Sequence, residues 1–220
     1  MKTFLVINSS GRVTRSVTRR LTARFVETWR DHNPGSTVII RDVGLSPPSP
    51  VSEHWIAAAF DDSGTPAEAL CESEALIQEI ISADAIVMGV PMYNFGLPAQ
   101  LKAYFDQVVR IGRTFAYRPN DDDPYRPLLS SRPCVVITSV SDVALYPHGA
   151  LAHLNFCDPH LTMLCNFIGI SEPMYIRAEE GLLRKPTALA QVETEVDRMA
   201  RSVSGVGCSR TTSREPGWRS

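Results

Sequence analysis

Short apolar runs rich in β-branched residues alternate along this chain with longer segments that repeat their apolar positions every three or four residues. The first pattern is typical of strands buried on both faces of a sheet, and the second is typical of helices that cover one. The runs that predict strands are Lys2–Asn8, Thr37–Arg41, Ala85–Val90, Pro133–Ser139 and Pro173–Arg177. The segments that predict helices are Ser16–Asp31, Thr65–Ser82, Leu97–Arg110, Pro159–Phe167 and Pro186–Val203, where Thr65 is the expected N-cap of its helix and Pro66 its first residue.

This alternation predicts an α/β protein with a doubly wound five-stranded parallel sheet and helices on both faces. The strand order 2-1-3-4-5 fits best, and its ligand crevice lies between the first and third strands. We expect a loop over Leu45–Ser52, which is rich in proline and serine, and a polar turn over Asn120–Pro124. Residues 1–203 are expected to form a single domain, and residues 204–220 a disordered C-terminal tail.

Composition excludes several classes of function. The chain has 220 residues, of which 44% are hydrophobic, and a net charge of −2 at pH 7, so it lacks the basic field that recruits nucleic acid. No apolar run approaches the length of a membrane span, and the five scattered cysteines lack metal-ligand spacing. We therefore expect a cytoplasmic protein with reduced thiols, no metal site and no membrane contact. Four arginines are interpreted as a solvated face of the first helix: Arg15, Arg19, Arg20 and Arg24.

The loop after the first predicted strand is rich in hydroxyl groups and leads into a helix. A helix N-terminus presents unpaired N–H groups to an anion, so Ser10, Ser16, Val17 and Thr18 suit a phosphomonoester held by neutral donors. Ordinary N-capping by Ser16 or Thr14 explains the same loop equally well. The loop matches neither a Walker sequence nor Gly-x-Gly-x-x-Gly.

The loop after the third predicted strand carries aromatic and amide side chains, which suit a flat ring with polar edges. Its candidate residues are Met92, Tyr93, Asn94 and Phe95, although Tyr93 and Phe95 would also serve to complete the core. The loop begins at Pro91 and leads into the helix that starts near Leu97.

The loop after the fourth predicted strand comprises Ser139, Val140, Ser141 and Asp142, and a plain polar connection is its alternative explanation. In the predicted topology this loop and the two preceding ones line the same crevice. One phosphate pocket beside two loops that face a ring describes a site for flavin mononucleotide (FMN).

Three segments carry a resemblance to a known family: Pro91-Met92-Tyr93-Asn94-Phe95, Gln100-Leu101-Lys102-x-Tyr104-Phe105-Asp106 and Arg110-x-Gly112-x-Thr114-Phe115-x-Tyr117. With them, the chain resembles the FMN-dependent NADH-azoreductases, which belong to the flavodoxin-like NAD(P)H:quinone oxidoreductases. The resemblance covers residues 1–203 and implies a flavodoxin-like fold.

The resemblance also implies a homodimer with one FMN per subunit, at sites shared across the interface. NADH or NADPH would reduce FMN and leave before a quinone or aromatic azo compound enters, a ping-pong sequence in which hydride passes through flavin N5. Ser10 and Ser16–Thr18 would hold the phosphate and ribityl end, Met92–Phe95 would contact the ring, and Ser139 would begin the third flavin loop. No catalytic side chain is expected, because the flavin carries the chemistry.

The third loop departs from the family pattern, which is commonly Ser-Arg-Gly-Gly, because this chain has Ser139-Val140-Ser141-Asp142. If the carboxylate of Asp142 faces the flavin, it would disfavour the anionic reduced state of the flavin. In that case we expect a lowered reduction potential of the flavin. Weaker binding of FMN is an equal expectation, since glycine permits close backbone approach.

Aromatic residues outside the three loops are candidates for the substrate pocket. Phe115 and Tyr117 are expected to position the ring or a substrate bound to the partner subunit. Tyr146 is expected to line the acceptor pocket, although it lies in an irregular stretch where residues can simply fill a loop.

Two other functions remain open at this point. An electron-carrying flavodoxin would bind FMN without being an enzyme, but such carriers are usually shorter and strongly acidic, unlike a chain of net charge −2. A flavin-free regulatory relative is the second, because the third loop is altered.

Overall fold

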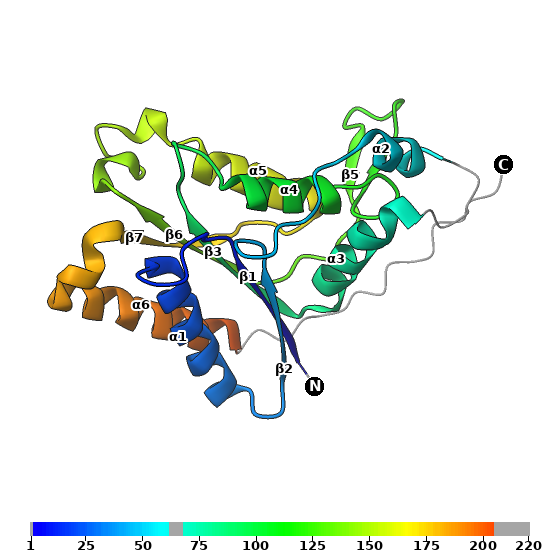
Figure 1. Cartoon of the computed structure of the whole chain (residues 1–220). Coiled ribbons are helices and arrows are strands. Elements are labelled where there is room, and N and C mark those ends of the chain that lie inside the picture. The colour runs from blue at the N-terminus through cyan, green and yellow to red at the C-terminus, as the bar shows by residue number, and fades with distance from the viewer. Residues whose placement is uncertain (1, 62–67, 205–220) are drawn as a thin grey trace.

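The computed structural model describes residues 2–61 and 68–204, and its main sheet has the predicted strand order (Figure 1). Within that part of the chain, five parallel strands lie in the order β2-β1-β3-β6-β7, which confirms the 2-1-3-4-5 arrangement. The strands are β1 (Thr3–Asn8), β2 (Thr37–Asp42), β3 (Ala85–Pro91), β6 (Cys134–Val140) and β7 (Met174–Glu179). The predicted helix start at Thr65 and Pro66, and the tail beyond residue 204, lie outside the described residues.

Helices cover both faces of the sheet, as Figure 1 shows. One face packs against α1 (Val17–His32) and α6 (Pro186–Ser204), and the other against α3 (Cys71–Ser82), α4 (Ala99–Val108) and α5 (Cys157–Ile168). Every residue of β3 and β6 is buried, which explains why the central strands are continuous apolar runs. On the first face the rings of Phe4 and Trp29 stack with centroids 4.4 Å apart.

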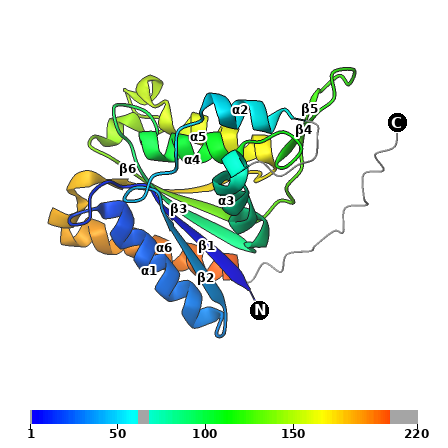
Figure 2. The same ribbon diagram turned by 45° about the vertical axis from the view of Figure 1, so that its right-hand side comes forward.

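One helix and one two-stranded hairpin were not predicted from the sequence. Helix α2 (Glu53–Ala59) buries only Trp55, whose indole N–H donates to Gln107 Oε1 at 2.8 Å. With one buried residue, the helix has no repeating apolar positions from which it could be predicted. The strands β4 (Phe115–Tyr117) and β5 (Tyr125–Pro127) pair antiparallel around the predicted polar turn. Figure 2 shows this hairpin projecting from the body of the molecule.

Arg20 and Arg24 of α1 are 52% and 40% exposed, as expected for a solvated helix face, and both also form ion pairs with α6. Arg20 Nη2 lies 2.9 Å from Glu193 Oε1, and Arg24 Nη2 lies 2.7 Å from Asp197 Oδ2, both carboxylates being on α6. These ion pairs join the two helices. They could not be predicted from the sequence, because the paired residues are more than 160 positions apart.

A close backbone approach joins the end of β2 to the loop that follows β1. Gly44 N–H donates to Asn8 O at 3.0 Å, and a Cβ placed on Gly44 would lie 2.2 Å from Ser10 O. Only glycine fits this contact, because neither of the two backbone segments can retreat without disturbing a strand.

Replacement of Gly44 by alanine is therefore expected to lower the free energy of unfolding by about 1–3 kcal/mol, as overpacking typically does. Urea unfolding followed by circular dichroism measures the effect. Gly11→Ala is the control, because a Cβ there would have no neighbour within 4 Å. Equal unfolding midpoints for Gly44→Ala and the unmodified protein would contradict the close approach.

Candidate functional site

A cavity of about 130 Å³ lies at the edge of the sheet where β1, β3 and β6 end. We call it the first cavity, and its lining residues are Ser10, Arg12, Arg15, Ser16, Val17, Pro91, Met92, Tyr93, Ser139, Ser141 and Glu180. The structure thus brings together residues from all three loops that the sequence singled out.

The N-terminus of α1 forms one wall of the first cavity. Ser16 caps the helix, with its Oγ accepting the N–H of Arg19 at 3.3 Å, and the same Oγ lies 3.3 Å from Thr18 Oγ1. The N–H groups of Val17 and Thr18 belong to the first turn and have no intrahelical acceptor. Capping and anion binding are therefore compatible here, and the two explanations of this loop do not compete.

Arg12 and Arg15 also line the first cavity beside the hydroxyl residues, so a phosphate held by neutral donors stays a prediction. Arg12 forms an ion pair with Glu180, which follows β7 in the chain. Arg15 precedes the Ser16 cap, so it belongs to the loop and not to the helix face, and its backbone is left-handed with φ of 59°. Arg12 and Arg15 stand among the hydroxyl residues of the loop, and this position is the sequence feature that could have identified them as site residues. No sequence feature identifies Glu180 in the same way.

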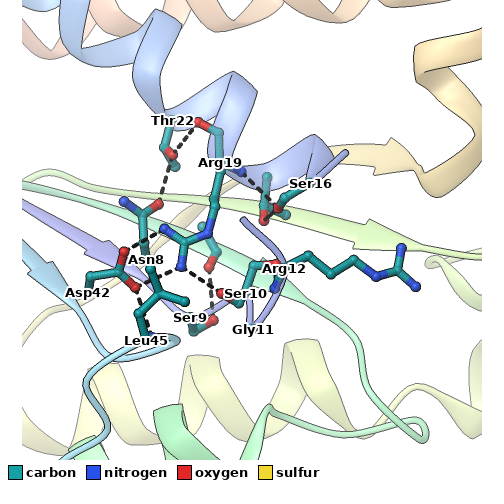
Figure 3. A network of polar contacts seen from close by, with 12 residues as sticks. Asn8, Ser9, Ser10, Gly11, Arg12, Ser16, Arg19, Thr22, Asp42 and Leu45 are labelled. Atoms are coloured by element: carbon teal, nitrogen blue, oxygen red, sulfur yellow. Dashed lines mark hydrogen bonds and ion pairs between the residues drawn. The ribbon is translucent and has the colours of Figure 1, made fainter. Parts of the chain in front are cut away.

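A forked ion pair holds the first loop in place (Figure 3). Arg19 Nη1 lies 2.5 Å from Asp42 Oδ2, Nη2 lies 2.7 Å from Asp42 Oδ1, and Nη2 also donates to Ser10 O at 2.6 Å. The hydrogen bond and positive charge of Arg19 lower the pKa of Asp42 below its usual value. The guanidinium therefore links α1, the end of β2 and the backbone of the loop.

The second loop is a tight turn. Tyr93 and Gly96 exchange backbone hydrogen bonds of 3.1 and 3.0 Å, and the two residues between them are left-handed, with φ of 48° at Asn94 and 68° at Phe95. This geometry matches the turn that usually joins paired strands and that favours Asn and Gly, which makes Phe95 unusual.

Within this turn, Tyr93 and Phe95 have different surroundings. Tyr93 lines the first cavity, and its hydroxyl accepts the N–H of Gly11 at 3.3 Å, which ties the second loop to the first. Phe95 is 49% exposed, so the alternative that it completes the core is wrong. Phe95 and the exposed Asn94 lie at the tip of the turn and are not among the residues that line the first cavity.

The third loop contributes only alternate residues. Ser139 and Ser141 line the first cavity, whereas Val140 points to the other side and is buried with Leu145 and Tyr146. Asp142 is exposed, and its Oδ1 accepts the N–H of Ala144 at 2.9 Å, capping a short 3-10 turn. The carboxylate is engaged by its own turn, so the structure gives no support to the expected effect on a flavin potential.

The three aromatic candidates lie outside the first cavity. Tyr146 is 8% exposed; its hydroxyl donates to Ala178 O at 2.7 Å and accepts the Ala178 N–H at 3.1 Å, and burial raises its pKa. It links β7 to the loop after β6, which corrects its placement in an acceptor pocket. Phe115 and Tyr117 lie in the hairpin beside the C-terminal end of α5, where Phe115 packs on Phe167 with ring centroids 4.8 Å apart. Figures 1 and 2 show β5 of this hairpin on the side of α2 and α3, away from α1.

Within residues 2–61 and 68–204, no group of three or more His, Cys, Asp or Glu lies close enough together to hold a metal. Across the same residues, no helix has the length and apolar character needed to cross a membrane. Cys71, Cys134, Cys157 and Cys165 are free thiols, and Cys208 lies outside the described residues.

A family model for the flavodoxin-like fold matches residues 2–201. The chain is 48% identical to an FMN-dependent NADH:quinone oxidoreductase of Opitutus terrae, over 90% of this chain and 96% of that protein. It is 41% identical to a protein of the same name from a Nostoc species, over 93% and 99%. An FMN-dependent NADH-azoreductase from Bacillus anthracis, solved with FMN, superposes with a TM-score of 0.79 at 22% identity, covering 93% of this chain and all of the other.

The Arg19–Asp42 pair generates a prediction about stability. Because the pKa of Asp42 is lowered on folding, its ionised form stabilises the protein above the usual pKa, and this contribution is lost as the pH falls through that range. Asp42→Asn is expected to cost about 1–2 kcal/mol at pH 7 and progressively less on acidification to pH of about 3.

Urea unfolding at a series of pH values measures this difference. Asp31→Asn is the control, since Asp31 is an exposed carboxylate near the other end of α1. A cost for Asp42→Asn that stayed constant with pH, or that matched the control at pH 7, would show that the pair does not hold the loop.

Proposed function

This chain belongs to the family of FMN-dependent NADH:quinone oxidoreductases with the flavodoxin-like fold, and we propose from this membership that it binds FMN and reduces quinones with NADH. The observation that carries the proposal is 48% identity across 96% of a relative of that name. The first cavity and the adjoining groove of about 980 Å³, which share Arg12, Arg15, Ser141 and Glu180, supply room for the cofactor at the sheet edge where parallel α/β folds bind their ligands.

The donor set at one end of the first cavity fits the phosphate of FMN. Hydroxyls of Ser10 and Ser16 line it, together with the start of α1 and the guanidinium of Arg15. In the part of the chain that the structure describes, Arg15 forms no ion pair with a carboxylate. A phosphate there would gain both the helix N-terminus and a free positive charge. We assign the phosphate and ribityl end to Ser10, Arg15 and the stretch Ser16–Thr18.

The opposite wall fits the ring. Met92 and Tyr93 present apolar and aromatic surface, while Ser139 and Ser141 offer hydroxyls from the third loop. FMN bound there would supply the two-electron chemistry at its N5, by which hydride from NADH or NADPH would reach a quinone or azo acceptor in a second step. The side chains orient the ring, and no protein acid or base is assigned a step.

Asn94 and Phe95 are assigned to the outer edge of the ring, because the turn places them beyond the first cavity. The backbone of Val140 and Asp142 continues the third loop, and their side chains are assigned no contact with the cofactor.

A homodimer in the cytoplasm is part of this proposal. Tyr117 and Tyr125 are each 48% exposed on the projecting hairpin, where they form an aromatic group with Phe115 and Phe167. Exposed aromatic clusters on projecting elements are typical of interfaces. We propose that a second copy covers this hairpin and that Phe115 and Tyr117 act at the site of the partner subunit. The free thiols suit a reducing compartment.

The purified protein tests the enzymatic proposal directly. We expect it to carry a flavin absorption spectrum or to acquire one with added FMN, and to oxidise NADH rapidly when menadione or an azo dye is present. A protein that binds FMN but oxidises NADH no faster than free FMN would be an electron carrier. A protein that takes up no FMN would be the flavin-free relative.

The role of Arg15 in holding the phosphate is tested by comparing two flavins. Arg15→Gln is expected to raise the Kd of FMN about tenfold and to leave the Kd of riboflavin, which has no phosphate, unchanged. Quenching of flavin fluorescence measures both. Arg30→Gln, on the exposed far end of α1, is the matched control. Equal weakening of both flavins by Arg15→Gln would mean that the residue shapes the loop and does not contact phosphate.

A further inference from the structure

Two exposed aromatic residues are neighbours beside the site, one in the second loop and one directly before α5. Phe95 is 49% exposed and Phe156 is 62% exposed. The N–H of Phe156 donates to the carbonyl oxygen of Phe95 at 2.9 Å, so the two residues meet although they are far apart in the sequence. Large apolar side chains left exposed next to each other are more typical of a binding surface than of internal packing.

The local structure requires an aromatic ring at neither position. Phe95 has φ of 68° in a turn that favours Asn and Gly, and such strain persists mainly at functional sites. Phe156 stands at the start of α5, but its side chain makes no capping hydrogen bond. Asn155 caps the helix, because its Oδ1 accepts the N–H groups of Cys157 and Asp158, both at 3.0 Å. A role in binding explains both rings better than a role in folding.

The backbone that carries Phe156 is held in place by the segment between β6 and α5. Within this segment the N–H of Leu151 donates to Ala144 O at 3.0 Å, and a Cβ on Gly149 would lie 2.2 Å from the same oxygen. The segment is therefore folded tightly on itself, and Phe156 is positioned before any ligand arrives. Binding to a surface that is already ordered loses less conformational entropy.

Two features join this aromatic pair to the first cavity. Phe95 belongs to the same turn as Tyr93, which lines the first cavity. Met92 also lines the first cavity, and it packs against the same small apolar cluster as Leu154, two residues before Phe156. The surface beyond the first cavity therefore continues from Tyr93 past Phe95 to Phe156.

We propose that Phe95 and Phe156 bind the second aromatic ring of an acceptor whose first ring lies on the flavin. This inference rests on the proposed function, because it needs the flavin ring beside Tyr93. Aromatic azo compounds have two rings, and the second would extend beyond the flavin, whereas a simple benzoquinone has one ring and would not reach Phe156. Both side chains are apolar, so they suit an uncharged ring better than the charged diphosphate of NADH. Phe156 thus selects for acceptors with two rings.

A pair of quinones that differ by one ring tests the selection. Protein loaded with FMN and reduced by NADH is mixed in a stopped-flow instrument with benzoquinone or with phenyl-substituted benzoquinone. Flavin absorbance then gives the second-order rate constant of reoxidation. Phe156→Leu removes the ring and keeps an apolar side chain, so it is expected to lower the rate constant for the phenyl-substituted quinone about three- to tenfold. The rate constant for benzoquinone is expected to stay within twofold.

Two further variants serve as controls. Phe156→Tyr keeps the ring and is expected to retain the rate constant for the phenyl-substituted quinone within twofold. Phe60→Leu is the matched control, because Phe60 is an equally exposed ring, 68% accessible, at the end of α2, and it is expected to change neither rate constant.

A loss that is confined to the phenyl-substituted quinone and absent from Phe156→Tyr supports the proposal. Equal losses for the two quinones, or a loss that Phe156→Tyr shares, would mean that Phe156 shapes the site as a whole. A result for Phe156→Leu that matches Phe60→Leu would mean that the second ring lies elsewhere. Each of these results overturns the proposal and leaves the proposed function standing. If the unmodified protein reduces neither quinone, the proposed function fails and this proposal falls with it.

Discussion

The forked pair between Arg19 and Asp42 is the interaction on which the candidate site depends. One guanidinium bonds both oxygens of a carboxylate at the end of β2 and the carbonyl of Ser10, so it links helix, strand and loop. Gly44 adds the close backbone approach from the same strand end. The Arg19–Asp42 pair and the contact at Gly44 together hold the loop after β1 in one position. The N-terminus of α1 therefore faces the first cavity.

Positive charge at this edge of the sheet comes from the loop and not from the protein as a whole. The net charge is −2, yet Arg12 and Arg15 both line the first cavity beside a helix N-terminus. Glu180 neutralises Arg12, and within the described residues Arg15 forms no ion pair, so the positive charge at the first cavity is local. Proteins commonly attract anionic cofactors in this way, with few charges in a concave site where they are poorly screened.

Much of the architecture followed from the sequence because it depends on patterns within each segment. Continuous apolar runs such as Ala85–Val90 predicted central strands, and their alternation with helices predicted the topology. Helix α2 was missed because its one buried residue, Trp55, contacts Gln107 more than 50 residues away. The hairpin was missed because β5 is exposed along its whole length and so shows no alternation.

Site residues could be predicted from the sequence where the composition of their own loop indicates a ligand. Ser16 and Tyr93 stand in loops whose composition indicates a ligand, and both line the first cavity. The positions of Tyr146 and Asp142 could not be predicted, because their partners, the backbone of Ala178 and the N–H of Ala144, are invisible in a pattern of residue types. A crystal structure of the protein with FMN is the most direct test of the central claim. The account predicts the phosphate at the N–H groups of Val17 and Thr18 with Arg15 beside it; a phosphate bound away from α1 would contradict it.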